Sequence, residues 1–178
     1  MNYVALLRGI NIGGRNKVVM SELKVGLERA GLSNVSTYIN SGNILFSSDE
    51  TRPDIVATVG RVITELFGLD IKVLLRSQAE IRATVTAMKD DWHTDATSRY
   101  DVMFLWDDVD NEESLKLITV KPEIESVEYV PGAFLWRVHK KDYGKSGVSK
   151  IVGTHLYKHM TVRNSNTARK LDVLLAAM

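Results

Sequence analysis

The chain is predicted to belong to the α+β class, as two ferredoxin-like subdomains with a connecting helix and a C-terminal helix. Strand-like apolar runs and helix-like amphipathic segments alternate in the first half in the order β-α-β-β-α-β, which is the split βαβ arrangement of a ferredoxin-like unit. The same element order returns in the second half. A length of 178 residues with 44% hydrophobic residues is enough for two small subdomains with packed cores.

The elements of the first half are predicted from periodicity and from residues that typically begin or end them. Strands are expected at residues 3–8, 35–40, 43–47 and 71–76, and helices at about 21–30 and 53–67. Ser21 is the predicted cap of the first helix, and Gly31 and Gly68 end the two helices. Ser41-Gly42 is a plausible two-residue hairpin turn, because glycine tolerates a positive φ.

The second half is predicted in the same way. It follows a connecting helix at 77–89 and a polar linker at 90–99, which separate a first subdomain (1–76) from a second (100–178). Strands are expected at 100–106, 127–130, 133–139 and about 159–163, and helices at about 112–119, 148–157 and 166–176. The halves share no obvious sequence identity, so the repeat is one of element order.

A polar loop follows the first strand, at residues 9–17, with the sequence Gly-Ile-Asn-Ile-Gly-Gly-Arg-Asn-Lys. Its glycines, amides and cations beside a core strand suit a negatively charged ligand. Gly9 and Gly14 stand at the spacing of a phosphate-binding P-loop, but Arg15-Asn16 replaces the required Lys-Ser/Thr. A looser nest of backbone amides for an anion is the interpretation that remains.

This loop is expected to lie beside the hairpin between the second and third strands, because both emerge at the same end of a ferredoxin-like sheet. The alternative is that the asparagines only shape turns, and that Arg8 pairs with a carboxylate such as Glu28 or Glu65. The predicted anion-binding residues of the first half are Arg8, Asn11, Gly13, Gly14, Arg15, Asn16, Lys17, Asn40, Ser41 and Asn43.

Two further segments of the second half are candidates for anion binding. The lysine-rich stretch at 140–150 interleaves Tyr143 among lysines, a combination that suits phosphate contact and base stacking. Helix N-termini attract anions, and one is expected just after Arg163. The alternatives are a solvated loop and ordinary helix capping. The predicted residues are Lys145, Lys150, Arg163, Asn164, Asn166 and Thr167.

The net charge of +1 conceals an asymmetry along the chain. Residues 90–128 carry 12 acidic and 3 basic side chains, whereas residues 137–170 carry 1 acidic and 9 basic ones. The two segments either neutralise each other inside the fold or leave a basic surface that attracts an anionic partner.

Several kinds of chemistry are not supported. The chain has no cysteine, and His155 and His159 have metal-ligand spacing without the glutamate of an H-E-x-x-H motif. Neither Ser41-Gly42 nor Ser146-Gly147 lies in a nucleophile elbow. No metal and no cofactor are therefore expected. No apolar run reaches membrane-spanning length and no signal peptide is recognisable, so a cytoplasmic protein without membrane contact is expected.

Three motifs resemble an uncharacterised bacterial family, a domain of unknown function. They are the opening Ala5-Leu6-Leu7-Arg8-Gly9-Ile10-Asn11 with Gly13-Gly14 and Asn16, the hairpin Tyr38-Ile39-Asn40-Ser41-Gly42-Asn43, and the segment Thr161-Val162-Arg163-Asn164-Ser165-Asn166-Thr167. The resemblance implies two α/β plaits and candidate sites, but no reaction. Many members have an aromatic residue between the two asparagines of the last motif, where this chain has Ser165.

Three functions are compatible with these observations. The favoured one is binding of an anionic, phosphate-bearing ligand, either nucleic acid or nucleotide, in a basic cleft expected between the two subdomains. The second is an enzyme acting on a phosphorylated or carboxylated metabolite, although no convincing general base is present. The third is a protein-interaction module. Oligomeric state is not indicated by the sequence.

Overall fold

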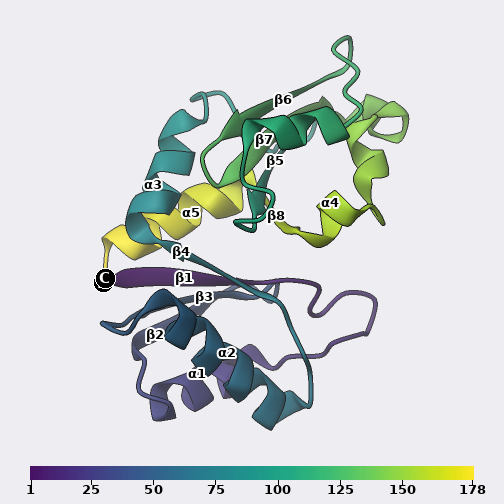
Figure 1. Ribbon diagram of the computed structural model, residues 1–178. Helices are drawn as coiled ribbons and strands as arrows, with labels where there is room; N and C mark the ends of the chain where they lie inside the picture. Colours follow the sequence, from purple (N-terminus) through teal and green to yellow (C-terminus); the bar gives the residue numbers. More distant parts are fainter. The chain divides into compact units, whose positions relative to one another are not determined.

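Each half of the chain builds one four-stranded antiparallel sheet in the computed structural model, which describes residues 1–178 (Figure 1). The chain divides into two units. The first contains residues 1–79 and 171–178, and the second contains residues 80–170. The predicted α+β class with two ferredoxin-like plaits is confirmed. No helix has the length and apolar character needed to cross a membrane.

The first unit has the predicted element order. Its elements are β1 (Asn2–Leu7), α1 (Met20–Arg29), β2 (Ser33–Tyr38), β3 (Asn43–Ser47), α2 (Arg52–Phe67) and β4 (Val73–Ser77). The strands lie in the order β2-β3-β1-β4, so β1 pairs with β3 and β4 in the centre of the sheet. The helices α1 and α2 cover one face (Figure 1).

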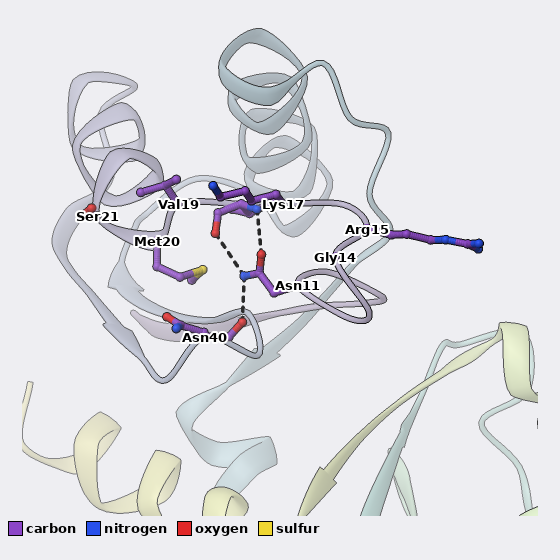
Figure 2. Close-up of a pocket in the computed structure, with 9 residues that line it drawn as sticks. Asn11, Gly14, Arg15, Lys17, Val19, Met20, Ser21 and Asn40 are labelled. Carbon is purple, nitrogen blue, oxygen red and sulfur yellow. Dashed lines mark hydrogen bonds between the residues drawn. The ribbon is translucent and has the colours of Figure 1, made fainter.

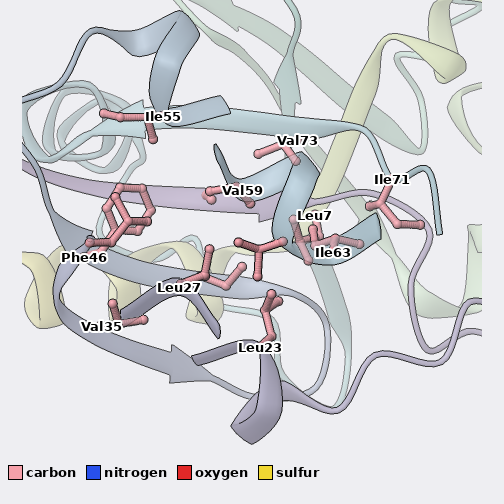
Figure 3. Packing of buried hydrophobic residues seen from close by; sticks show 14 of the residues in the cluster. Leu7, Leu23, Leu27, Val35, Phe46, Ile55, Val59, Ile63, Ile71 and Val73 are labelled. Atoms are coloured by element: carbon pink, nitrogen blue, oxygen red, sulfur yellow. The ribbon is translucent and has the colours of Figure 1, made fainter. Parts of the chain in front are cut away.

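The core of the first unit lies between this face and the two helices. Alternate residues of β1, namely Tyr3, Ala5 and Leu7, belong to it, as the period of two in a strand requires. The helices contribute buried residues at helical spacing. Figure 3 shows this packing with Leu7, Leu23, Leu27, Val35, Phe46, Ile55, Val59, Ile63, Ile71 and Val73.

The start of α1 and the β2–β3 turn differ from the predictions. The helix begins at Met20, and Val19, not Ser21, is its N-cap, with no side-chain hydrogen bond. Tyr38 pairs with Asn43, so the turn has four residues, Ile39–Gly42, rather than two. The Asn43 side chain closes it by donating to the Tyr38 carbonyl (2.9 Å) and the Ser41 hydroxyl (3.0 Å). Hydrogen bonds from a side chain that close a turn in this way cannot be predicted from the spacing of apolar residues.

The second unit repeats the strand order as β6-β7-β5-β8. The elements after β4 are α3 (Gln78–Ala87), β5 (Ser98–Leu105), η1 (Glu112–Leu117), β6 (Glu125–Val130), β7 (Ala133–His139), η2 (Lys140–Lys145), η3 (Val148–Ile151), α4 (His155–Lys158), β8 (Met160–Asn164) and α5 (Ser165–Ala176). Strand β5 takes the central place of β1, pairing with β7 and β8.

The two helices predicted inside the second unit are wrong in type and length. The segment predicted at 112–119 is the six-residue 3₁₀ helix η1, which ends where Ile118 becomes extended. The segment predicted at 148–157 is the short 3₁₀ helix η3 followed by the one-turn helix α4. Gly153, at φ 91°, interrupts the helical path between them.

Gly42 provides a test of how tightly the β2–β3 turn packs on the sheet. It has φ 80°, and a Cβ atom there would lie 2.7 Å from Leu7 Cβ. We expect Gly42→Ala to lower the free energy of unfolding by about 2 kcal/mol, through overpacking and backbone strain. Urea unfolding measures this. Gly144→Ala, where a Cβ would meet nothing within 4 Å, is the control. Equal stability of the two variants would contradict the packing described.

Candidate functional site

The loop after β1 is a small hairpin, called here the loop hairpin (residues 9–17). Its tip is a two-residue turn at Gly13-Gly14, with φ of 57° and 75°. Ile12 pairs with Arg15, whose backbone N–H donates to the Ile12 carbonyl at 3.0 Å. A type I′ turn needs positive φ at both central residues, and two glycines meet this need without strain. The glycines are therefore explained by the turn itself.

Asparagines hold the base of the loop hairpin. Asn11 and Asn16 both have positive φ (53° and 49°), which asparagine tolerates better than most residues. The Asn11 N–H donates to the Asn16 carbonyl (3.1 Å), and the Asn16 side chain donates to the Gly9 carbonyl (2.9 Å). These amides therefore brace the loop, which is the structural interpretation that the sequence left open.

The Asn11 side chain joins three segments (Figure 2). Its Oδ1 accepts from the Val18 N–H (2.9 Å), and its Nδ2 donates to the Val18 carbonyl (3.1 Å) and the Asn40 carbonyl (2.9 Å). The expectation that the loop and the β2–β3 turn are neighbours is thus confirmed. The same bonds hold the loop hairpin beside the start of α1.

An open pocket of about 640 Å³ lies where these three segments meet. Its apolar lining comes from the residues that lead into α1, and its polar lining from the loop hairpin and the turn. The lining residues are Asn11, Gly14, Arg15, Lys17, Val18, Val19, Met20, Ser21 and Asn40. In Figure 2 the Arg15 side chain projects away from the other labelled residues.

The pocket is electrostatically positive. Arg15 and Lys17 are exposed and neither forms an ion pair, and no carboxylate lines the pocket. The first-turn amides of α1 have no acceptor within the helix, and Val19 offers no capping side chain. The N-terminus of α1 therefore adds partial positive charge. Glu22, exposed in the first turn, is the acidic residue nearest to it in sequence.

Three other predicted residues of the first unit have different surroundings. Asn43 is buried and closes the β2–β3 turn together with Ser41. Arg8 is half-buried, its backbone N–H bonds the Lys72 carbonyl, and it does not line the pocket. The carboxylates considered as partners for Arg8 pair with cations of their own helices, Glu28 with Lys24 (3.8 Å) and Glu65 with Arg61 (3.2 Å).

In the second unit, the basic segment 140–150 is held by one buried carboxylate. Glu125 accepts hydrogen bonds from the Ser146 hydroxyl, the Gly147 N–H (2.8 Å), the Lys121 N–H (3.0 Å) and Trp136 Nε1 (3.2 Å). Burial raises the pKa of Glu125, but these hydrogen bonds outweigh it and leave the pKa below the ordinary value. The segment is therefore anchored at its centre.

Tyr143 and Lys145 already have contacts within this segment. Tyr143 packs against Trp136, with ring centroids 5.8 Å apart, and the Arg99 guanidinium lies 4.8 Å from its ring. Lys145 pairs with Asp142 at 3.5 Å. Lys150 is exposed and forms no ion pair. Because Trp136 and Arg99 already contact the Tyr143 ring, less of that ring is free to stack on a base.

The predicted residues around the start of α5 mainly organise the backbone. Arg163 is buried and donates to Thr161 Oγ1 (3.0 Å), and burial lowers its pKa to about 10. Asn164 Oδ1 accepts from the Thr167 N–H (2.8 Å), the geometry of a helix cap. Asn166 donates to the Thr94 carbonyl (2.8 Å). Capping and tethering are what these contacts do.

The acidic and basic segments are joined by strand pairing and by the Glu125 hydrogen bonds, but few ion pairs connect them. Lys140, Lys141 and Lys150 form no ion pair, whereas His159 contacts Asp108. His155 and His159 stack on each other at 4.4 Å, but no group of three or more His, Asp or Glu side chains could hold a metal ion. These three lysines of the basic segment are therefore not neutralised by ion pairs with the acidic one.

Residues 18–21 line the pocket but are not among the site residues predicted from the sequence. Val18, Val19 and Met20 form an apolar run directly before a predicted helix, and such a run predicts packing in the core. Ser21 was predicted to be the N-cap of that helix. The signal available in the sequence was the apolar run directly after Lys17. The predicted residues otherwise divide among the pocket, the anchored segment 140–150 and the start of α5.

Comparison with known proteins gives a family and a structural relative. The family model described as "Protein of unknown function (DUF1697)" matches residues 1–135. The structure of the conserved bacterial protein SP0830 from Streptococcus pneumoniae is similar, with 29% sequence identity, 98% of each chain covered and a TM-score of 0.83. No curated protein matches the chain.

Asn11→Asp tests the hydrogen bonds that the Asn11 side chain forms with Val18 and Asn40. The aspartate keeps the acceptor for Val18 N–H but loses both donated bonds, so the Val18 and Asn40 carbonyls face a carboxylate. We expect the free energy of unfolding to fall by about 1–2 kcal/mol, as measured by urea unfolding. Asn34→Asp is the control, because Asn34 also has positive φ (54°) but donates only to Ser47 Oγ, at 3.3 Å. A similar loss in both variants would argue against a special role for Asn11.

Glu125 predicts a pH dependence of stability. Its pKa is lower in the folded than in the unfolded chain, so its contribution is complete above its ordinary pKa of 4.5 and is lost as the pH falls through the folded value. We expect Glu125→Gln to be less stable than the parent at pH 7, with the difference shrinking as the pH falls below 4.5. Urea unfolding between pH 3 and 7 measures it. A difference independent of pH would contradict this role.

Proposed function

Because the chain belongs to the DUF1697 family of proteins of unknown function, its ligand must be argued from its own residues, and we propose that it binds a phosphate-bearing anion in the pocket beside the loop hairpin. The observation that carries the proposal is a pair of exposed, unpaired cations, Arg15 and Lys17, at a pocket with no carboxylate in its lining.

The lining divides into a part for the anion and a part for the body of the ligand. Lys17 and the first-turn amides of α1 supply positive charge and N–H donors, as at other phosphate-binding helix starts. Val18, Val19 and Met20 supply apolar surface. A volume of about 640 Å³ lies in the range of small-molecule pockets, so a nucleotide-sized group has room here.

All residues that line this pocket belong to the first unit. Lys145 and Lys150 stay a predicted second contact region for an anionic ligand. The pocket lining contains no histidine and no carboxylate, so its side chains support binding better than acid–base catalysis. A cytoplasmic location without membrane contact is part of the proposal, since nucleotides and nucleic acids are abundant in that compartment.

Titration of the ¹⁵N-labelled protein with inorganic phosphate and adenosine monophosphate tests the proposal. We expect salt-sensitive amide shifts at Met20, Ser21 and Glu22, and at least a three-fold weaker affinity for Lys17→Ala. Arg29→Ala is the matched control, because it removes one exposed cation from the last turn of the same helix. Shifts confined to other regions, or equal affinity of the two variants, would refute the proposed pocket.

A further inference from the structure

We propose that the anion bound beside the loop hairpin is the backbone of a single-stranded nucleic acid, and that Ile12 and Ile39 contact its bases. This inference rests on the proposed function and names its ligand class. It follows from four side chains, Ile12, Arg15, Lys17 and Ile39, called here the tip surface. All four are exposed.

Ile12 is presented outward by the geometry of the loop hairpin. The turn residues Gly13 and Gly14 have no side chains, so Ile12 and Arg15 are the first side chains on either side of the tip. Ile12 is 68% exposed. A single exposed isoleucine is ordinary, but one placed beside a cation at the end of a braced hairpin forms a compact contact element with an apolar and a charged part.

Ile39 is exposed under backbone strain. It has φ 51° in the β2–β3 turn and is 51% exposed. A β-branched residue at positive φ is an outlier, and asparagine or glycine would occupy this position with less strain. About half of the residue stays exposed despite that cost. Strain at a half-exposed β-branched residue is a reason to look for a function of the side chain.

The two isoleucines belong to loops that are joined directly. The Asn11 Nδ2 donates to the Asn40 carbonyl at 2.9 Å, and Ile12 and Ile39 are the neighbours of these two residues in the sequence. The hydrogen bond thus fixes the loop hairpin and the β2–β3 turn to each other. The tip surface therefore combines two loops whose bonded residues lie 29 positions apart in the chain.

The directions of the cations favour a ligand longer than the pocket. Arg15 projects away from the other pocket residues, whereas Lys17 directly precedes the apolar residues that lead into α1 (Figure 2). A compact anion is best held by converging donors. Charges that point in different directions suit a ligand with repeated phosphates, and exposed apolar side chains on the same two loops suit the faces of unpaired bases.

Single strands fit this surface better than a duplex. In a duplex the faces of the bases are stacked and closed to side chains, and sequence is read from the groove edges instead. Ile12 and Ile39 carry no donors or acceptors for those edges, and the side-chain amides of Asn11 and Asn16 already donate to backbone carbonyls. Aliphatic contact with base faces carries no hydrogen-bond pattern, so the expected binding shows little sequence preference.

Fluorescence anisotropy with labelled oligothymidylates of 4, 8 and 12 nucleotides tests the inference. We expect affinity to rise with length and to fall about five-fold in Ile12→Ser and in Ile39→Asn. Arg15→Ala should weaken binding and reduce the slope of log K against log salt by about 0.7. Leu117→Ser is the control, since Leu117 is also 68% exposed and lies in η1.

Folding and binding are separated by a thermal melt of each variant. Ile39→Asn relieves strain, so it should melt at or above the parent temperature while binding less tightly. If phosphate and adenosine monophosphate bind with dependence on Lys17 but affinity does not rise with oligonucleotide length, the proposed function stands and this inference is wrong. Undiminished binding by Ile12→Ser and Ile39→Asn, or equal affinity for a duplex or for polyglutamate, also overturns it. Absence of all binding removes both proposals.

Discussion

The amide of Asn11 is the interaction on which the arrangement of the candidate site depends. Its side chain satisfies both backbone groups of Val18 and reaches the Asn40 carbonyl, so the loop hairpin, the residues directly after it and the more distant β2–β3 turn share one partner. Backbone groups at such a junction would otherwise need water or a strand partner. The loop hairpin, the start of α1 and the β2–β3 turn therefore hold their positions because one neutral side chain can donate and accept at once.

In the second unit a charged side chain, the Glu125 carboxylate, joins separate segments as the Asn11 amide does in the first. The second unit has the same strand order as the first unit, but short 3₁₀ segments replace the long amphipathic helix that packs on the first sheet. With less apolar surface to fix the connection between β7 and β8, the chain uses the buried Glu125 carboxylate, which gathers N–H and O–H donors from Lys121, Trp136, Ser146 and Gly147. Gly147 fits because a Cβ there would lie 2.1 Å from the Thr119 carbonyl oxygen.

Sequence patterns predicted what depends on periodicity and topology, and missed what depends on particular side-chain contacts. The strand order and the meeting of the loop hairpin with the β2–β3 turn follow from alternation and from the βαββαβ path. The predicted N-cap of α1 was wrong because the extended Val19 takes that position, directly after Val18, whose backbone groups both bond the Asn11 side chain. The helix expected at 148–157 was wrong because its apolar spacing could not reveal the Glu125 anchor or the positive φ of Gly153.

The candidate site could be located in the sequence, but the tasks of its residues could not be assigned. Amides and cations of the loop look alike as donors in a sequence, yet the structure divides them. The side-chain amides of Asn11, Asn16 and Asn43 donate to backbone carbonyls. Arg15 and Lys17 instead form no ion pair, although the chain has 22 acidic residues. By contrast, the predicted cation Arg163 is buried and bonded within its own strand. Because neutral amides hold the loop in shape and its cations form no ion pair beside a pocket without a carboxylate, the loop hairpin is a stronger candidate for an anion site than the start of α5.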